Sequence, residues 1–210
     1  MSRSDLRRDY SDEPLDEARS DRDPFRQFSV WFEQAVLVEA DPTAMALATA
    51  TSDGRPSVRT VLLKGVDEKG LLFFTNYHSR KAREMDQTGR ASLLFLWRAV
   101  ERQVRVEGRV EKVTDAESDA YFDTRPLESR WSVYASRQSE RVESRDALES
   151  RFDIARQTYG EGVTRPRWWG GYRVVPDEFE FWQGRPNRLH DRLQYSRQTD
   201  GSWVKARLAP

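Results

Sequence analysis

The sequence predicts a mainly β protein with flanking helices (α+β), folded as a closed or nearly closed barrel. Between residues 44 and 113, short apolar segments are separated by tight-turn signals such as Ser52-Asp53-Gly54-Arg55, a pattern typical of antiparallel strands. More strand-like segments follow near the C-terminus. Nearly nine strands with few helices favour a barrel, because a barrel leaves no long exposed edge.

The predicted strands share short length and flanking turn residues. In chain order they are expected at 44–51, 56–64, 71–76, 91–97, 102–113, 171–175, 178–183, 188–197 and 202–208. We expect the first five to form an antiparallel meander, with residues 65–70 as a turn and a helix at 79–87 inserted before the fourth strand.

Three other helices have recognisable signals. Phe25, Phe28 and Trp31 recur at helical spacing, which predicts a helix from about residue 25 to 36 packed on the core. Thr114 and Glu117 form a capping box that opens a helix ending near Arg125-Pro126. A helix at 144–159, followed by Gly160, completes the set, and we expect the last two to cover the sheet.

Composition limits the possible functions. Lysine plus arginine and aspartate plus glutamate both total 35, so no overall field attracts nucleic acid or anionic lipid. The chain has no cysteine and two histidines, which argues against a metal site. No apolar run is long enough to span a membrane, and we expect a soluble, cytoplasmic protein.

The chain is expected to form one domain with an N-terminal arm. Residues 1–25 hold 13 charged residues, eight acidic and five basic, so this arm should be mobile when no ligand is bound. Residues 26–210 form the single barrel domain.

The segment 180–192 offers the first candidate site. In a regular strand Arg188, His190 and Arg192 would share one face, beside Trp182, and could hold an anionic aromatic ligand. A solvated strand edge whose charges discourage aggregation is an equally simple interpretation.

Two further basic groups lie on neighbouring elements. Ser79, Arg80 and Lys81 open a helix, where unpaired backbone N–H groups favour phosphate, although a solvated helix start has the same sequence. Arg59 and Lys64 are five residues apart, so they can share a ligand only at a bulge or a strand end.

Tyr121, Arg125 and Ser129 are spaced by four residues and form a second possible phosphate site. We expect Tyr121 in the last turn of its helix and the other two residues on the following loop, since Pro126 interrupts the helix. A helix-end tyrosine with a capping arginine is the alternative. The chain has no glycine-rich phosphate loop, metal-binding histidine pair or Gly-x-Ser-x-Gly motif, which favours binding of a phosphorylated cofactor that performs the chemistry.

Five separated motifs occur in one order: 41–45 (DPTAM), 59–64 (RTVLLK), 75–82 (TNYHSRKA), 101–104 (ERQV) and 181–192 (FWQGRPNRLHDR). With 6–10 (LRRDY) and the terminal 207–210 (RLAP), they make nearly the whole chain resemble the pyridoxine/pyridoxamine 5'-phosphate oxidase family. The resemblance implies a split β-barrel of the FMN-binding type and a homodimer with FMN at the subunit interface.

The resemblance also implies which residues hold FMN. Within one subunit these are Arg59, Thr60, Val61, Leu62, Lys64, Phe74, Thr75, Ser79, Arg80, Lys81 and Gln103, and from the partner subunit Gln138, Ser139, Trp182 and Arg192. The family usually has tyrosine where Phe74 stands, so any contact made by that hydroxyl is lost here.

The implied substrates are pyridoxine and pyridoxamine 5'-phosphate, oxidised to pyridoxal 5'-phosphate with O2 as electron acceptor. Lys64, Tyr121, Arg125 and Ser129 would hold the substrate phosphate, Arg188 and His190 would be the catalytic pair beside its ring, and Arg7 and Tyr10 would belong to a lid. Two alternatives remain open, a split-barrel flavin reductase and a non-catalytic pyridoxal phosphate carrier. A nucleic-acid module is disfavoured by the zero net charge and the acidic arm.

Overall fold

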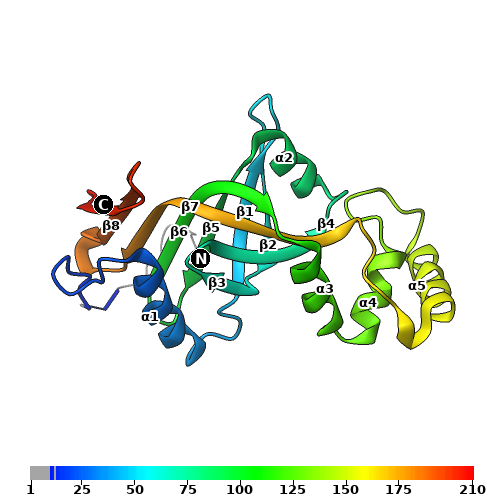
Figure 1. The fold of residues 1–210 in the computed structure, drawn as a ribbon. Coiled ribbons are helices and arrows are strands. Elements are labelled where there is room, and N and C mark those ends of the chain that lie inside the picture. The colour runs from blue at the N-terminus through cyan, green and yellow to red at the C-terminus, as the bar shows by residue number, and fades with distance from the viewer. Residues whose placement is uncertain (1–9, 12) are drawn as a thin grey trace.

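A computed structural model describes residues 10–11 and 13–210 (Figure 1). The fold is a split barrel of antiparallel strands in a nine-stranded sheet, ordered β2-β1-β5-β6-β7-β4-β3, with β8 paired to β7 and β9 to β8. The predicted fold class is confirmed. The strands are β1 (Ala44–Ala50), β2 (Pro56–Leu62), β3 (Gly65–Asp67), β4 (Gly70–Asn76), β5 (Arg90–Trp97), β6 (Arg102–Lys112), β7 (Trp169–Gln183), β8 (Asp191–Arg197) and β9 (Trp203–Arg207).

Five α-helices and two short 3-10 turns flank the described part of the sheet. They are α1 (Pro24–Val36), α2 (Arg80–Thr88), α3 (Asp115–Asp123), α4 (Leu127–Ala135), α5 (Arg145–Tyr159), η2 (Gly160–Gly162) and η3 (Pro186–Arg188). The predicted capping box of Thr114 and Glu117 is confirmed, and Ser79 and Ser144, at two other predicted helix starts, also accept a backbone hydrogen bond. None of the described helices has the length and apolar content that a membrane span requires.

The barrel core is closed on one side by α1. Phe28 is fully buried and Trp31 is 4 % exposed, and both face aromatic residues of the sheet. The ring of Phe28 lies 5.1 Å from that of Phe95, and the ring of Trp31 lies 5.3 Å from that of Phe181. Helical spacing therefore located both the helix and its buried face.

The predicted five-stranded meander is wrong. Strand β1 pairs with β5 as well as with β2, and β4 pairs with β7, which is more than 90 residues further along the chain. The expected turn at 65–70 also contains the short strand β3. Strand periodicity identifies hairpin neighbours, but it carries no signal for such long-range partners.

The two strands expected at 171–175 and 178–183 are one strand, β7, which crosses the molecule in Figure 1. Its register with β6 shifts between Glu107 and Gly108, opposite Pro176. A β-bulge at this point accommodates the proline without ending the strand. Gly108 is required there, because a Cβ atom would lie 2.1 Å from the Val175 carbonyl oxygen.

Helix α4 was not predicted, and it carries Ser129, which was expected on a loop. Pro126 ends the α3 segment and directly precedes α4, a position that proline tolerates at a helix start. Helix α5 packs against α4, not against the sheet as expected, while α3 packs against β7 (Figure 1).

The described part of the N-terminal arm contacts the C-terminal strands. Leu15 is 5 % exposed, and its backbone N–H donates to the Asp191 carboxylate at 3.1 Å. Arg207 donates to Glu17 from Nε at 2.6 Å. These contacts hold part of the arm against the barrel, and its mobility without ligand stays a prediction. Arg7 lies outside the described residues, so its assignment to a lid stays a prediction.

Candidate active site

A cavity of about 550 Å³ lies where the ends of β2 and β4 meet α2, α3 and α4. It collects most of the residues expected to hold FMN within one subunit, together with three of the four expected at the substrate phosphate. The predicted residues that line it are Arg59, Thr60, Val61, Leu62, Lys64, Phe74, Thr75, Lys81, Tyr121, Arg125 and Gln138.

Arg59 and Lys64 reach this cavity together because β2 ends at Leu62. The strand-end condition set by their spacing is therefore met. The Arg59 guanidinium donates from Nη1 to the Leu47 carbonyl at 2.9 Å and to Thr49 Oγ1 at 2.6 Å. Burial lowers the pKa of Arg59, and the nearby Glu84 carboxylate partly restores it.

The first turn of α2 borders the same cavity. Ser79 caps the helix, and the backbone N–H of Arg80 donates to Ser139 Oγ at 3.1 Å. Lys81, which is 7 % exposed, donates to Thr75 Oγ1 at 3.2 Å and to Gln138 Oε1 at 3.1 Å. Burial and then repulsion from Arg59 lower the pKa of Lys81 to about 8.

Gln138 and Ser139 were expected to come from a partner subunit, but the structure places them beside Lys81 and Arg80 of the same chain. The loop that follows α4 folds back over the start of α2, which the sequence did not indicate. They therefore lie at the cavity of their own chain, and their contact with FMN, from either subunit, stays a proposal.

Aromatic rings form one wall of the cavity. Phe74 stacks on Tyr121 with ring centroids 3.9 Å apart, and Trp169 extends the stack 5.6 Å from Phe74. The phenylalanine that replaces the usual tyrosine thus has a packing role. Trp169 is 6 % exposed and belongs both to the buried cluster around Phe122 and to this wall, a position that no sequence motif marked.

Two cationic side chains near this wall have no anionic partner among the described residues. The Arg125 guanidinium lies 4.7 Å from the Trp169 ring, and its buried Nη1 has no hydrogen-bond partner among residues 10–11 and 13–210. The exposed Lys64 ammonium makes no hydrogen bond or ion pair within that part of the chain either. Ser129 does not line the cavity.

A second cluster contains the predicted site residues of β6, β7 and β8, together with Tyr10. The Tyr10 ring lies 5.6 Å from Trp182 and 5.2 Å from His190, while Trp182 and His190 are 4.7 Å apart. Gln103 pairs with Trp182 across β6 and β7. Arg192 donates from Nε to the buried Glu180 at 2.8 Å.

The shared strand face predicted for Arg188, His190 and Arg192 is wrong. Arg188 ends the 3-10 turn η3 with a φ of 62°, and β8 begins at Asp191. The backbone N–H of Arg185 donates to His190 Nδ1 at 3.1 Å, which leaves the proton of the neutral ring on Nε2. Burial and then repulsion from Arg188 lower the pKa of His190.

This second cluster does not border the first cavity. Trp169 and Trp182 lie near opposite ends of β7, which corresponds to about 40 Å along the strand at the usual rise per residue. Figure 1 likewise shows β8 at one end of the molecule and α3 and α4 at the other. The predicted site residues therefore form two groups within one chain.

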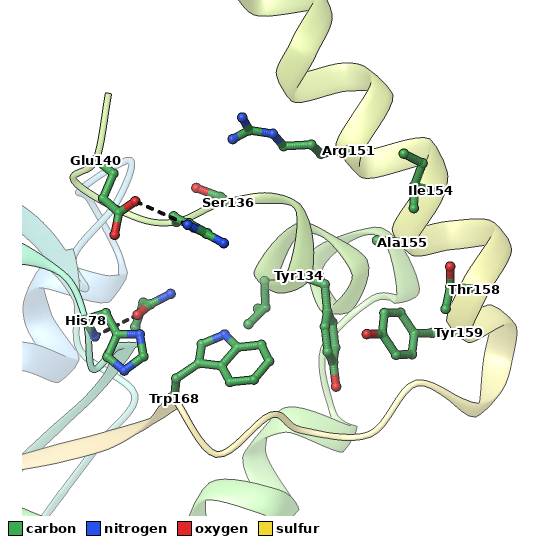
Figure 2. Close-up of a pocket in the computed structure, with 13 residues that line it drawn as sticks. His78, Tyr134, Ser136, Glu140, Arg151, Ile154, Ala155, Thr158, Tyr159 and Trp168 are labelled. Atoms are coloured by element: carbon green, nitrogen blue, oxygen red, sulfur yellow. Dashed lines mark hydrogen bonds and ion pairs between the residues drawn. The ribbon is translucent and has the colours of Figure 1, made fainter. Parts of the chain in front are cut away.

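A second cavity of about 580 Å³ adjoins the first and shares Asn76, Val133 and Ser136 with it. Figure 2 shows His78 and Trp168 on one side and Tyr134 and Tyr159 on the other, with α5 above. None of the predicted site residues lines this cavity. Its aromatic residues are spread from 78 to 168 in the sequence, so no local motif marked it.

The hydrogen-bond donors of the first cavity suit the phosphate group of the expected flavin. Arg59 and Lys81 supply positive charge, and the first turn of α2 supplies backbone N–H groups. The apolar Val61 and Leu62 and the ring wall offer surface to a flat aromatic system.

Comparison with known proteins agrees with this chemistry. A family model described as pyridoxamine 5'-phosphate oxidase matches residues 32–159, and one for the pyridoxine 5'-phosphate oxidase C-terminal dimerisation region matches residues 169–210. A pyridoxine/pyridoxamine 5'-phosphate oxidase of Cupriavidus pinatubonensis is 56% identical over 208 residues, covering 99% of this chain and 98% of that protein. One of Rubrobacter xylanophilus is 55% identical over 207 residues, covering 98% and 95%.

Two solved structures are also similar. PhzG from Burkholderia lata, in complex with tetrahydrophenazine-1-carboxylic acid, has a TM-score of 0.89 at 33% identity and covers 95% of this chain and 100% of that one. A pyridoxamine 5'-phosphate oxidase-related, FMN binding protein from Nostoc punctiforme has a TM-score of 0.72 at 18% identity, with 90% and 98% covered, and supports the fold alone.

Proposed function

The chain belongs to the pyridoxine/pyridoxamine 5'-phosphate oxidase family and is an FMN-dependent oxidoreductase, and we propose that it converts pyridoxine and pyridoxamine 5'-phosphate to pyridoxal 5'-phosphate. Bound FMN would accept a hydride from C4' of the substrate and pass two electrons to O2, giving H2O2. The alcohol substrate then yields the aldehyde directly, and the amine yields it after addition of water and release of ammonia.

One observation carries the proposed substrate class. The buried Nη1 of Arg125 has no hydrogen-bond partner among the described residues, and an unpaired buried N–H group of a cation is costly unless an acceptor completes it. Tyr121 and Lys64 line the same cavity. We assign the substrate phosphate to these three side chains, with Ser129 as a more distant contributor from the first turn of α4.

Arg59, Lys81 and the first turn of α2 hold the FMN phosphate in this proposal, with Arg80, Ser79 and Ser139 beside it. Thr60 to Leu62, Phe74, Thr75 and Gln138 line the remaining cavity. Together they fix the cofactor relative to the substrate phosphate, and orientation of this kind lowers the barrier by removing translational and rotational freedom.

We infer that a second copy of the chain completes the site. Trp182 lies about 40 Å along β7 from Trp169 in the cavity wall, and the rest of its cluster lies around it: Gln103, Arg188, His190 and Arg192. We therefore assign this cluster to the flavin of a partner subunit, which for Gln103 replaces the expectation that it serves its own subunit. The match of residues 169–210 to the family's dimerisation region supports this arrangement. His190, with its proton on Nε2, and Arg188 would face the substrate ring, and Tyr10 would help exclude water.

The visible absorption spectrum of the purified protein tests the proposal. Under anaerobic conditions, pyridoxine 5'-phosphate should bleach the flavin bands, and air should restore them with one H2O2 formed per aldehyde. A flavin spectrum that does not respond to either vitamin phosphate would favour a flavin reductase. A protein that cannot take up FMN would favour the carrier.

A further inference from the structure

Glu84 is a buried carboxylate directly behind the cation-lined cavity. Its side chain is 3 % exposed, although it projects from the same short helix, α2, that borders the proposed phosphate site. Glu84 does not line the cavity itself. Its role must therefore be exerted through the side chains that it contacts.

The two carboxylate oxygens of Glu84 bind two different cations. Oε1 accepts from Arg80 Nε at 2.7 Å, whereas Oε2 lies 3.3 Å from Arg59 Nη2. Arg59 comes from β2 and Arg80 from α2. One carboxylate thus joins the two elements that supply positive charge to the proposed phosphate site.

Two hydroxyl groups fix the carboxylate. Thr49 Oγ1 and Ser57 Oγ each donate to Glu84 Oε2 at 2.5 Å, and the same two hydroxyl oxygens accept from Arg59. Burial opposes ionisation of Glu84, but the hydrogen bonds from Ser57, Thr49 and Arg80 outweigh it and lower its pKa to about 2. The group is therefore an anion throughout the physiological pH range.

A buried anion near a phosphate site can act in two opposite ways. It can repel the phosphate, or it can hold the cations in the orientation that the phosphate requires. The hydrogen bonds that join Glu84, Arg59, Thr49 and Ser57 favour the holding role. Without them the Arg59 side chain would have several orientations, and ordering it on phosphate binding would cost conformational entropy.

We propose that Glu84 is a positioning residue that holds Arg59 and Arg80 in place for the FMN phosphate. The inference rests on the proposed placement of that phosphate in the first cavity. It predicts an effect on cofactor affinity that depends on the phosphate group and is absent for riboflavin, which has the same ring system without phosphate.

The test compares FMN and riboflavin binding to full-length protein stripped of flavin, by quenching of flavin fluorescence. Glu84→Gln keeps the side-chain volume and removes the charge. We expect it to weaken FMN binding about tenfold, the usual scale for a lost hydrogen bond to a charged group, and to leave riboflavin binding unchanged. Unchanged or tighter FMN binding would overturn the proposal, as would an equal loss for both ligands, which indicates a purely structural role.

Two further variants make the result specific. Glu149→Gln is the matched control, because it removes the carboxylate of another i,i+4 arginine–glutamate pair, on α5 and outside the site; it should leave both affinities unchanged. If Glu84→Gln does not fold, Glu84→Asp keeps the buried charge but shortens its reach to Arg80. Glu84→Asp should then lose part of the preference for FMN over riboflavin, and full retention of that preference would contradict the proposal.

Lys81→Ala separates failure of this inference from failure of the phosphate placement. If Lys81→Ala weakens FMN binding and Glu84→Gln does not, only the role of Glu84 is wrong. If Lys81→Ala has no effect on FMN binding, the phosphate lies elsewhere, and both assignments are overturned.

Discussion

The Lys81 ammonium donates to the Gln138 amide oxygen at 3.1 Å, joining two residues that are 57 positions apart. This contact ties α2 to the loop that follows α4, at the edge of the proposed FMN site. Gln138→Leu removes the acceptor, so we expect FMN affinity to fall about three- to tenfold. Fluorescence titration measures it. Gln198→Leu, at an exposed position beyond β8, is the matched control, and equal effects of both variants would contradict a role for Gln138.

Lys81 predicts a pH dependence of FMN affinity. Its pKa in the flavin-free protein is lowered to about 8, by burial and then by Arg59. Below pH 8 the ammonium is present before FMN binds, whereas above pH 8 binding must also take up a proton. We therefore expect the affinity to be constant near pH 7 and to fall by up to about tenfold per pH unit above 8.

Lys81→Arg is the control for this pH dependence, because a guanidinium stays protonated over the whole range. Its FMN affinity should be independent of pH between 7 and 9.5, whatever its absolute value. A wild-type affinity that does not change across that range would show that Lys81 does not contact the phosphate.

Arg125 should act on the phosphorylated substrate and not on the cofactor. Its half-buried guanidinium carries a buried Nη1 that has no hydrogen-bond partner among the described residues, and it lies beside Tyr121 and Trp169. We expect Arg125→Ala to raise KM for pyridoxine 5'-phosphate by at least about tenfold and to leave FMN content unchanged. Steady-state kinetics and the flavin-to-protein absorbance ratio measure both quantities. Arg156→Ala on α5 is the control, and an unchanged KM for Arg125→Ala would remove this residue from the site.

Gly184 allows Tyr10 to pack beside His190. A Cβ atom at residue 184 would lie 2.3 Å from Tyr10 Cδ1, so Gly184→Ala must displace the tyrosine ring. If Tyr10 helps to close the site, this variant should lower kcat several-fold with FMN retained, and Tyr10→Ala should lower it equally. Gly162→Ala is the control, since its added methyl group meets no atom within 4 Å. Normal turnover in Gly184→Ala would exclude a role for Tyr10 in closure.

Assembly of the site from two subunits predicts complementation between variants. Lys64→Ala alters the first cavity, and His190→Leu alters the cluster near the other end of β7. Each variant alone should have little activity. After unfolding and refolding in a mixture, half of the dimers are mixed and each contains one intact site, so about a quarter of the wild-type activity should return. If both groups served the same subunit's site, no activity would return.

Much of the fold could be predicted from local sequence. The helix caps at Ser79, Thr114 and Ser144, and the apolar spacing around Phe28, depend on neighbouring residues alone. Strand order could not be predicted in this way, because the pairing of β4 with β7 joins segments far apart in the chain. Helix α4 was missed because Pro126 was interpreted as a stop signal, although a helix starts directly after it.

The candidate site, too, could be predicted only in part from the sequence. Motif resemblance predicted Arg59, Lys81 and Arg125 to be cofactor or substrate residues, and the structure brings all three to one cavity. It did not identify Glu84, whose partners Thr49 and Ser57 lie on two different strands. The i,i+4 spacing of Arg80 and Glu84 was the available signal, but such pairs are common on exposed helices.

By itself the sequence determined the family, the fold class, the cofactor and most helix and strand positions, because these depend on local patterns and on motifs that keep their order along the chain. Only the tertiary structure decided that the predicted site residues form two groups near opposite ends of β7, that Gln138 and Ser139 lie beside Lys81 and Arg80 of their own chain, and that a buried carboxylate contacts Arg59. The physical reason is that these relationships arise from contacts between segments distant in sequence, where neither hydrophobic periodicity nor residue spacing carries information.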